Sequence, residues 1–221
     1  MATSFLSEWL DRVKAKAAKK VPMFLNTRRL TFLTLLFAIM VFVSYSLAYK
    51  HLGFIWLASF FIFAHLISDN LDGAVGRYRR EGYVKWGLYA DHFFDFIHFT
   101  ALVFGLYMVI REPAFLTYFI IIYILGCAFF IHCFLYASAT GRFIVSALMI
   151  SALEIILGLL VFNTIIFFFG KKILLNHILY IVLIIIMFLT LIFSFIKVQR
   201  KLAEIDMKIK NRNKKNNKKK T

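Results

Sequence analysis

The sequence predicts an all-α integral membrane protein with six transmembrane helices and an N-terminal amphipathic interfacial helix. Hydrophobic residues make up 62% of the 221 residues, and the mean hydropathy is +0.79. Six apolar stretches each reach the roughly 20 residues that a helix needs to cross a bilayer. The net charge of +16 lies mostly outside these stretches. These observations exclude a soluble domain.

The N-terminal segment, residues 1–21, has no apolar core ahead of its charges, so we do not expect a secretory signal peptide. Apolar residues recur in it at helical spacing, and basic residues gather toward its end. The apolar set is Phe5, Leu6, Trp9, Leu10 and Val13, and the basic set is Arg12, Lys14, Lys16, Lys19 and Lys20. This pattern predicts an interfacial helix whose basic end faces anionic headgroups. A disordered basic leader is the alternative.

The apolar spans follow one another with short connections. They cover about residues 30–49, 52 to the aspartate motif, 83–110, 114–137, 143–169 and 173–196. Short connections favour antiparallel neighbours. Because no repeat or linker divides the chain, we expect one membrane domain over residues 22–197, between the interfacial helix (1–21) and a tail (198–221).

The tail ends in a run of Lys and Asn and has no aromatic side chains on which bases could stack. Nucleic-acid binding is therefore not expected. Such a basic segment beside a membrane is attracted to anionic lipids. We expect it to be a disordered cytoplasmic tail, which either binds the lipid surface or serves solubility alone.

The distribution of basic residues predicts the orientation. All but four of the 27 Lys and Arg residues lie at the N-terminus, after the second and fourth spans, or in the tail. The positive-inside rule then predicts that both termini lie on the cytoplasmic side of the membrane. We expect this membrane to be a bacterial or archaeal plasma membrane.

The segment from Ser68 to Asp95 places four aspartates inside two apolar spans. A carboxylate at membrane depth is costly unless a cation, a partner or water compensates it. Residues three, four, seven and eight apart share one helix face. The motif therefore forms two stripes, with Asp69, Asp72, Gly73, Gly76 and Arg77 on one helix and Gly87, Asp91 and Asp95 on the next.

Four carboxylates on facing stripes would repel one another, so we expect a positive group between them. Oxygen ligands suit Mg²⁺, Mn²⁺ or Ca²⁺, and Mg²⁺ is usually held together with substrate phosphates. The glycines leave room for a ligand, and Arg77 offers a donor fork for phosphate. Asp69 precedes Arg77 by eight residues, which is about 12 Å along the helix axis. This short distance from the basic end of the helix predicts a shallow intramembrane cavity that opens to the cytosol.

This segment resembles the signature of the CDP-alcohol phosphotransferases, also called CDP-alcohol phosphatidyltransferases, D-x2-D-G-x2-A-R-x8-G-x3-D-x3-D. Its positions are filled in order by Asp69, Asp72, Gly73, Arg77, Gly87, Asp91 and Asp95. Gly76 stands where alanine is usual, and nine residues instead of eight separate Arg77 from Gly87. The extra residue falls in the connection between two helices, where a loop absorbs it at little entropic cost.

The resemblance implies an enzyme of phospholipid biosynthesis. It would transfer a phosphatidyl or phospho-alcohol group from a CDP-alcohol, which we expect to be CDP-diacylglycerol, to a polar acceptor alcohol and release CMP. The resemblance also implies a two-metal centre of Mg²⁺ or Mn²⁺ held by Asp69, Asp72, Asp91 and Asp95. Asp95 would also be the general base, and the CDP moiety would lie on Gly73, Gly76 and Arg77. Family members often form homodimers, and the motif identifies neither donor nor acceptor.

Other polar residues carry weaker expectations. His92 lies within D-H-x-x-D, which resembles the choline and ethanolamine branch of the family, but adjacent helix positions point about 100° apart, so we expect it to pack between helices. His65 and His98 are expected to be hydrogen-bonded histidines inside the bundle. Arg142 either contacts an acceptor phosphate or anchors the span. Glu154 is predicted to be buried near the middle of the fifth span.

Three other functions remain open at this stage. Intramembrane prenyltransferases also bind a diphosphate through Mg²⁺ and aspartates, although they carry two separated motifs in a longer bundle. A metal-ion transporter with an acidic site is a second alternative, although transporters often show repeats in both halves. The third is a catalytically silent family member that serves as a scaffold.

Overall fold

The computed structural model describes the backbone of residues 5–141 and 152–217, and the side chains of residues 13–141 and 154–211. These residues form helices joined by short connections, without a strand among them. Contacts divide the chain into two compact units, one of residues 1–119 with 152–176 and one of residues 120–151 with 177–221. The all-helical prediction is thus confirmed for the described residues.

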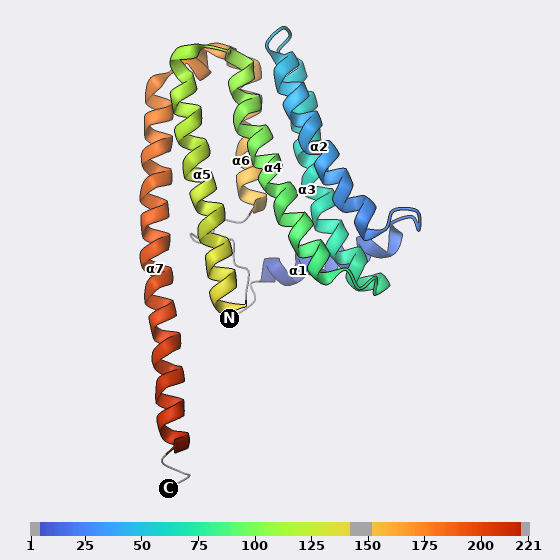
Figure 1. Cartoon of the computed structure of the whole chain (residues 1–221). Helices are drawn as coiled ribbons and strands as arrows, with labels where there is room; N and C mark the ends of the chain where they lie inside the picture. The colour runs from blue at the N-terminus through green and yellow to red at the C-terminus, as the bar shows by residue number, and fades with distance from the viewer. Residues whose placement is uncertain (1–4, 142–151, 218–221) are drawn as a thin grey trace. The chain divides into compact units, whose positions relative to one another are not determined.

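The first unit is built on three long apolar helices, α2, α3 and α4 (Figure 1). Their bounds are Thr27–Ala48, Phe54–Arg79 and Val84–Ile110. α2 packs along both α3 and α4, whereas α3 and α4 approach each other closely at few positions. Side chains that meet between α3 and α4 therefore span a wider gap than those between either helix and α2. This gap holds the polar residues described below.

Shorter elements complete this unit. α1 (Phe5–Lys20) and α6 (Ala152–Phe169) both pack against α3, and the 3₁₀ helix η1 (Lys171–Leu175) follows α6. α1 falls where the interfacial helix is predicted, but its place at a membrane surface remains a prediction.

Within the described residues, five helices are long and apolar enough to cross a membrane, in agreement with an integral membrane protein. They are α2, α3, α4, α5 (Pro113–Thr140) and α7 (His177–Asn217). The apolar part of α6, Glu154–Phe169, is shorter. Because residues 142–151 of the predicted fifth span lie outside the described part, the count of six spans remains a prediction.

The second unit contains α5 from residue 120 onward and α7. The buried Ser194 hydroxyl lies 2.9 Å from Nε2 of His132, and Lys201 lies over the ring of Tyr136. α7 continues without interruption to Asn217. The expectation of a disordered tail is therefore wrong for residues 198–217, which lack Gly and Pro and contain many good helix formers.

The chain before α2 is fixed to the end of α3. Asn26 caps α2 by accepting a hydrogen bond from the backbone N–H of Arg29 at 2.9 Å. Ala18, Leu30, Ala74 and Val75 form a buried apolar cluster that joins α1, α2 and α3. These contacts hold the beginning of α2 against the last turns of α3, which carry the aspartate motif.

The opposite end of the first unit carries the four basic residues expected outside the cytoplasm, which are Lys50, Arg111, Lys171 and Lys172. Arg111 and Lys171 both lie over the ring of Tyr49, at 4.6 and 4.5 Å from its centroid. Lys171 also donates to the carbonyl of Tyr49. Burial, together with the nearby Arg111 charge, lowers the pKa of Lys171. Lys172 is exposed in η1.

Candidate active site

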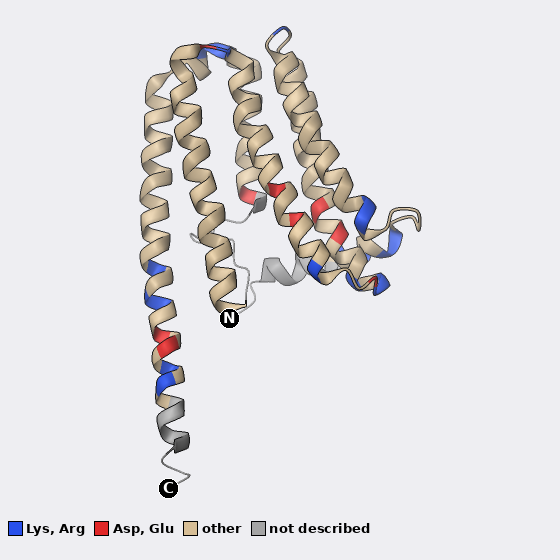
Figure 2. Cartoon of the chain, in the orientation of Figure 1, with Lys and Arg blue, Asp and Glu red and all other residues tan. Residues whose placement is uncertain are grey.

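The aspartates of the two predicted stripes meet between α3 and α4. Figure 2 shows acidic residues of the two helices next to one another, toward the helix ends that carry basic residues. The carboxyl groups of Asp69 and Asp91 lie close enough to share a hydrogen bond. Asp72 and Asp95 also act electrostatically on Asp69. The structure thus brings the four aspartates of the motif together.

The four carboxylates differ in exposure. Asp72 is buried, with 5% of its surface exposed, and Asp69 and Asp91 are half-buried. The side chain of Asp95 is 37% exposed and lies 3.8 Å from Nδ1 of His92. A molecule from outside the bundle can therefore reach Asp95 more easily than Asp72.

Thr31 of α2 holds the buried end of this cluster. Its hydroxyl lies 2.8 Å from Oδ2 of Asp72 and 3.0 Å from the carbonyl oxygen of Thr27. The hydroxyl of Thr27 donates to the backbone carbonyl of Asp72 at 3.3 Å. Both threonines are buried. α2 therefore fixes the position of Asp72 through a side-chain and a main-chain contact.

The glycines of the motif have three different surroundings. A Cβ on Gly73 would lie 3.3 Å from Nη1 of Arg77, so this glycine lets the Arg77 side chain fold back over α3. A Cβ on Gly76 would lie 2.9 Å from the hydroxyl of Thr27. The usual alanine of the signature would therefore crowd α2. Gly87 has open space around its Cβ position.

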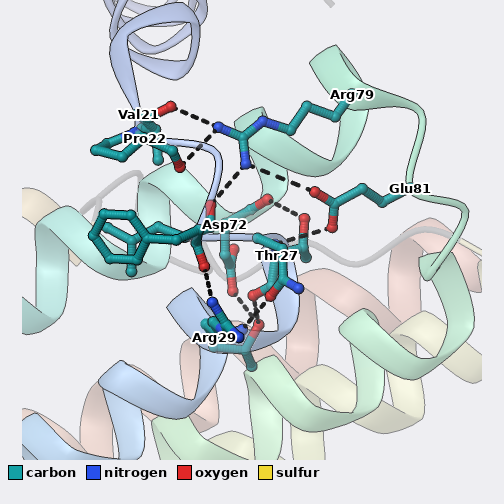
Figure 3. Close-up of polar contacts among 11 residues, drawn as sticks. Val21, Pro22, Thr27, Arg29, Asp72, Arg79 and Glu81 are labelled. Atoms are coloured by element: carbon teal, nitrogen blue, oxygen red, sulfur yellow. Dashed lines mark hydrogen bonds and ion pairs between the residues drawn. The ribbon is translucent and has the colours of Figure 1, made fainter.

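A polar clamp of Arg79 and Glu81 closes the end of α3 (Figure 3). The guanidinium of Arg79 donates to the carbonyls of Val21 at 2.6 Å and Leu25 at 2.8 Å, and it lies 4.0 Å from the carboxylate of Glu81. Glu81 accepts a hydrogen bond from the N–H of Thr27 at 3.0 Å. An acid at this position satisfies a free N–H at the start of α2 and favours its helix dipole.

The donor set fits a hard divalent cation, because it consists of carboxylate oxygens. Oδ1 of Asp91 is buried without a hydrogen-bond partner. Within the described residues, however, no three His, Cys, Asp or Glu side chains are grouped tightly enough to hold a metal ion. Metal binding therefore remains a proposal.

Comparison with known proteins decides the family. The family model of the CDP-alcohol phosphatidyltransferases matches residues 24–196. The chain belongs to this family. No curated protein and no solved structure shows a significant match to the chain. The match spans α2 to the transmembrane part of α7 and includes the whole aspartate motif. As a member of a phosphotransferase family of lipid synthesis, the protein is assigned to this broad class of enzyme.

Several residues of this family member were not singled out from the sequence. They are Thr27, Thr31, Arg79 and Glu81, which position the motif from α2 and from the end of α3. One signal was available, because Thr27, Thr31 and Thr34 recur at helical spacing in an apolar helix. A polar stripe of this kind indicates a buried face with polar partners.

The remaining sequence expectations have mixed outcomes. Glu154 is exposed in the first described turn of α6, so its predicted burial is wrong. His65 and His98 are buried as expected, but Nε2 of His65 and both ring nitrogens of His98 have no partner among the described residues, so the expectation that each is fully hydrogen-bonded is wrong. His92 lies beside Asp95, as stated above. Arg142 lies outside the described residues.

Proposed function

We propose that this protein transfers a phosphatidyl or phospho-alcohol group from a CDP-alcohol, by preference CDP-diacylglycerol, to the hydroxyl group of an acceptor alcohol. The observation that supports it is the meeting of four aspartates between α3 and α4, inside the segment that matches the family. In this reaction the acceptor oxygen forms a new bond to the β-phosphorus of the donor. The bond between that phosphorus and the CMP oxygen breaks, and CMP leaves.

Asp95 is the proposed general base. Its side chain is 37% exposed, whereas Asp72 is buried, and a base must lie within hydrogen-bond reach of the proton that it removes. It takes the proton of the acceptor hydroxyl as the oxygen attacks, and the proton then passes to water. His92, 3.8 Å away, contributes to the orientation of this carboxylate.

Asp69, Asp72, Asp91 and Asp95 are the proposed ligands of Mg²⁺ or Mn²⁺. When bound, two such ions would neutralise the diphosphate and the charge that develops on the leaving CMP. Thr31 holds Asp72 in place for this role, and the unpartnered Oδ1 of Asp91 is free to accept a cation. The half-buried positions of Asp69 and Asp91 limit competition from water.

The CDP moiety is proposed to lie along Gly73, Gly76 and Arg77. Arg77 is exposed and its guanidinium lies next to Gly73, so it can turn from the helix surface to a phosphate oxygen. Gly87, which has open space at its Cβ position, leaves room on the facing helix. For Gly76, packing against Thr27 supplies a separate structural reason for glycine. With both termini in the cytoplasm, a soluble nucleotide would enter from the cytosol.

The test is release of CMP by the purified full-length protein in lipid or detergent. CDP-diacylglycerol and CDP-ethanolamine serve as donors, each with a panel of acceptor alcohols, in the presence of Mg²⁺ or Mn²⁺. We expect CMP release with at least one pair and its loss when EDTA removes the cation. CDP binding without turnover of any pair would indicate the silent scaffold instead.

Two further measurements separate the alternatives. Release of diphosphate from a prenyl donor would favour a prenyltransferase, and cation uptake into vesicles without CMP release would favour a transporter. Family membership favours the phosphotransferase over both. A homodimer remains a prediction that light scattering of the detergent-solubilised protein would check.

A further inference from the structure

A pair of buried histidines bridges the gap between α3 and α4. The rings of His65 and His98 stack with centroids 3.7 Å apart and an interplanar angle of 16°. Their exposed fractions are 4% and 6%. His65 precedes Asp69 by four residues and His98 follows Asp95 by three, so each ring shares a helix face with an aspartate of the motif. The pair thus lies one turn from the carboxylates, on the side away from Arg77.

The pair does not behave like a purely structural contact. Nε2 of His65 and both ring nitrogens of His98 lack a hydrogen-bond partner among the described residues. A buried polar atom without a partner destabilises a protein, especially within a bilayer. Two phenylalanines would stack in the same space without this cost. The presence of unpartnered ring nitrogens despite this cost indicates that a ligand forms hydrogen bonds with them.

The chemistry of the rings indicates the ligand class. A neutral imidazole has one N–H donor and one acceptor nitrogen, and a hydroxyl group likewise donates and accepts. No Lys or Arg lies within one turn of either histidine along α3 or α4. A phosphate group would therefore find no cation on these helices there. Hydroxyl groups are the better match.

The position of the pair indicates which substrate supplies the hydroxyls. The proposed diphosphate contact, Arg77, lies twelve residues from His65, about 18 Å along α3. Asp95, by contrast, is close enough to His65 to act on it electrostatically. A substrate that presents its reacting hydroxyl to Asp95 would have its neighbouring groups near the rings.

We propose that the His65–His98 pair binds further hydroxyl groups of the acceptor alcohol, and that the acceptor is therefore a polyhydroxyl compound. This inference rests on the proposed function, since it assigns the acceptor side of the same site. Acceptors of this class include inositol and glycerol, with or without a phosphate directed toward the cytosol. Ethanolamine, and diacylglycerol with its single free hydroxyl, lie outside the class.

Kinetics of phenylalanine variants test the proposal. His65→Phe and His98→Phe keep an aromatic stack but remove the hydrogen-bonding atoms. We expect the KM for the polyhydroxyl acceptor to rise about tenfold, while the KM for the CDP-alcohol stays within about twofold and the thermal midpoint does not fall. His98→Asn, which retains a donor and an acceptor, should recover part of the loss. His132→Phe, in the second unit, is the matched control.

Two kinetic outcomes would overturn the proposal. One is an unchanged acceptor KM in both phenylalanine variants, which would make the pair structural. The other is turnover with diacylglycerol or ethanolamine as acceptor and with no polyhydroxyl compound.

A binding measurement on the wild-type protein does not depend on turnover. The full-length protein with ¹⁵N-labelled histidine is titrated with myo-inositol, myo-inositol 1-phosphate or glycerol 3-phosphate, and with ethanolamine as the control. We expect the ring ¹⁵N signals of His65 and His98 to shift with a polyhydroxyl probe and not with ethanolamine. If no pair of substrates releases CMP, the proposed function fails, and this titration still decides the inference. If no polyhydroxyl probe shifts the ring ¹⁵N signals of His65 and His98, the inference is overturned.

Discussion

Two buried polar groups in the first unit differ in whether their hydrogen bonds are complete. In one, the hydroxyl of Tyr45 donates to Oδ1 of Asn163 at 2.9 Å, and Nδ2 of Asn163 donates to the hydroxyl of Ser59 at 2.9 Å. Ser59 in turn donates to the carbonyl of Ile55. This network links α2, α3 and α6, and each of its side chains has a partner within the protein.

The group between α3 and α4 is incomplete by the same measure. Oδ1 of Asp91 is buried without a hydrogen-bond partner in the described part of the chain, as are Nε2 of His65 and both ring nitrogens of His98. Burial of polar atoms is costly in both groups, but the first offsets this cost with internal hydrogen bonds. The first group, whose hydrogen bonds are complete, is a closed network that holds helices together. The second, which has unpartnered polar atoms, is an open group that we interpret as a ligand site. The predictions below test this difference.

The largest effect is expected at the open group. Asp95→Asn removes the proposed base and one of the four proposed metal carboxylates with little change in shape, so turnover should fall by roughly 10²–10⁴-fold, by a larger factor than Mn²⁺ binding through Asp69, Asp72 and Asp91 weakens, while CDP binding is kept. CMP release and equilibrium binding of Mn²⁺ and CDP measure the two parts. Asp206→Asn, at an exposed position of α7, is the control. An Asp95→Asn protein with a near-normal rate would contradict the assignment of the base.

The second prediction concerns the contact between α2 and the open group. Thr31→Val keeps the shape of the side chain but removes the hydroxyl 2.8 Å from Asp72. Because partners of metal ligands tune affinity, Mn²⁺ binding should weaken by about tenfold to a hundredfold, and Thr31→Ser should restore it. Titration followed by electron paramagnetic resonance measures the free ion.

Thr34→Val is the matched control for Thr31→Val. The hydroxyl of Thr34 donates to the carbonyl of Thr31, 2.6 Å away in the same helix, and not to an aspartate. Equal Mn²⁺ affinity in the two valine variants would show that the hydroxyl of Thr31 does not position Asp72 for a cation.

The third prediction breaks the closed network. Asn163→Leu leaves the hydroxyls of Tyr45 and Ser59 without their amide partner, so the free energy of unfolding should fall by about 1–2 kcal/mol. The rate per folded molecule should stay unchanged, because the network binds no substrate. Thr164→Val, whose hydroxyl bonds the carbonyl of Leu160 in its own helix, is the control. A loss of rate in the folded variant, without loss of stability, would remove the distinction between the two groups.

Helix periodicity explains how much of the site the sequence predicts. The spacing of Asp69, Asp72, Asp91 and Asp95 determines which face of each helix they share, and the structure places those faces together. The contact between Thr31 and Asp72 joins residues 41 apart. This contact depends on the rotation of α2 and α3 about their own axes and on the distance between them. Periodicity within one helix determines neither.

The same reasoning accounts for the differences in the fold. Hydropathy located the apolar helices, because burial in lipid requires long apolar segments. It did not predict that α7 continues to Asn217, since a charged segment can be helical or disordered with the same composition. Nor did it place Glu154, whose exposure depends on the packing around α6. Local pattern therefore predicts elements better than it predicts their ends and surroundings.

The smallest effects are expected from two alanine substitutions that compare tight packing with open space. Gly76→Ala places a methyl group 2.9 Å from the hydroxyl of Thr27, so stability should fall by about 1 kcal/mol. Gly87→Ala meets no atom within 4 Å, so stability should hold or rise by about 0.4–1 kcal/mol as the unfolded chain loses freedom. Thermal unfolding of both variants measures this difference.

The two substitutions should have different effects on ligand binding. If the space beside Gly87 is kept for the nucleotide, Gly87→Ala should weaken CMP binding although the protein is at least as stable. The Thr27→Ala/Gly76→Ala double variant should recover the stability lost in Gly76→Ala, relative to Thr27→Ala alone, since the crowding hydroxyl is gone. Unaltered CMP binding in Gly87→Ala would instead mean that the open space on α4 faces lipid, and the nucleotide would then have to lie entirely on the α3 side.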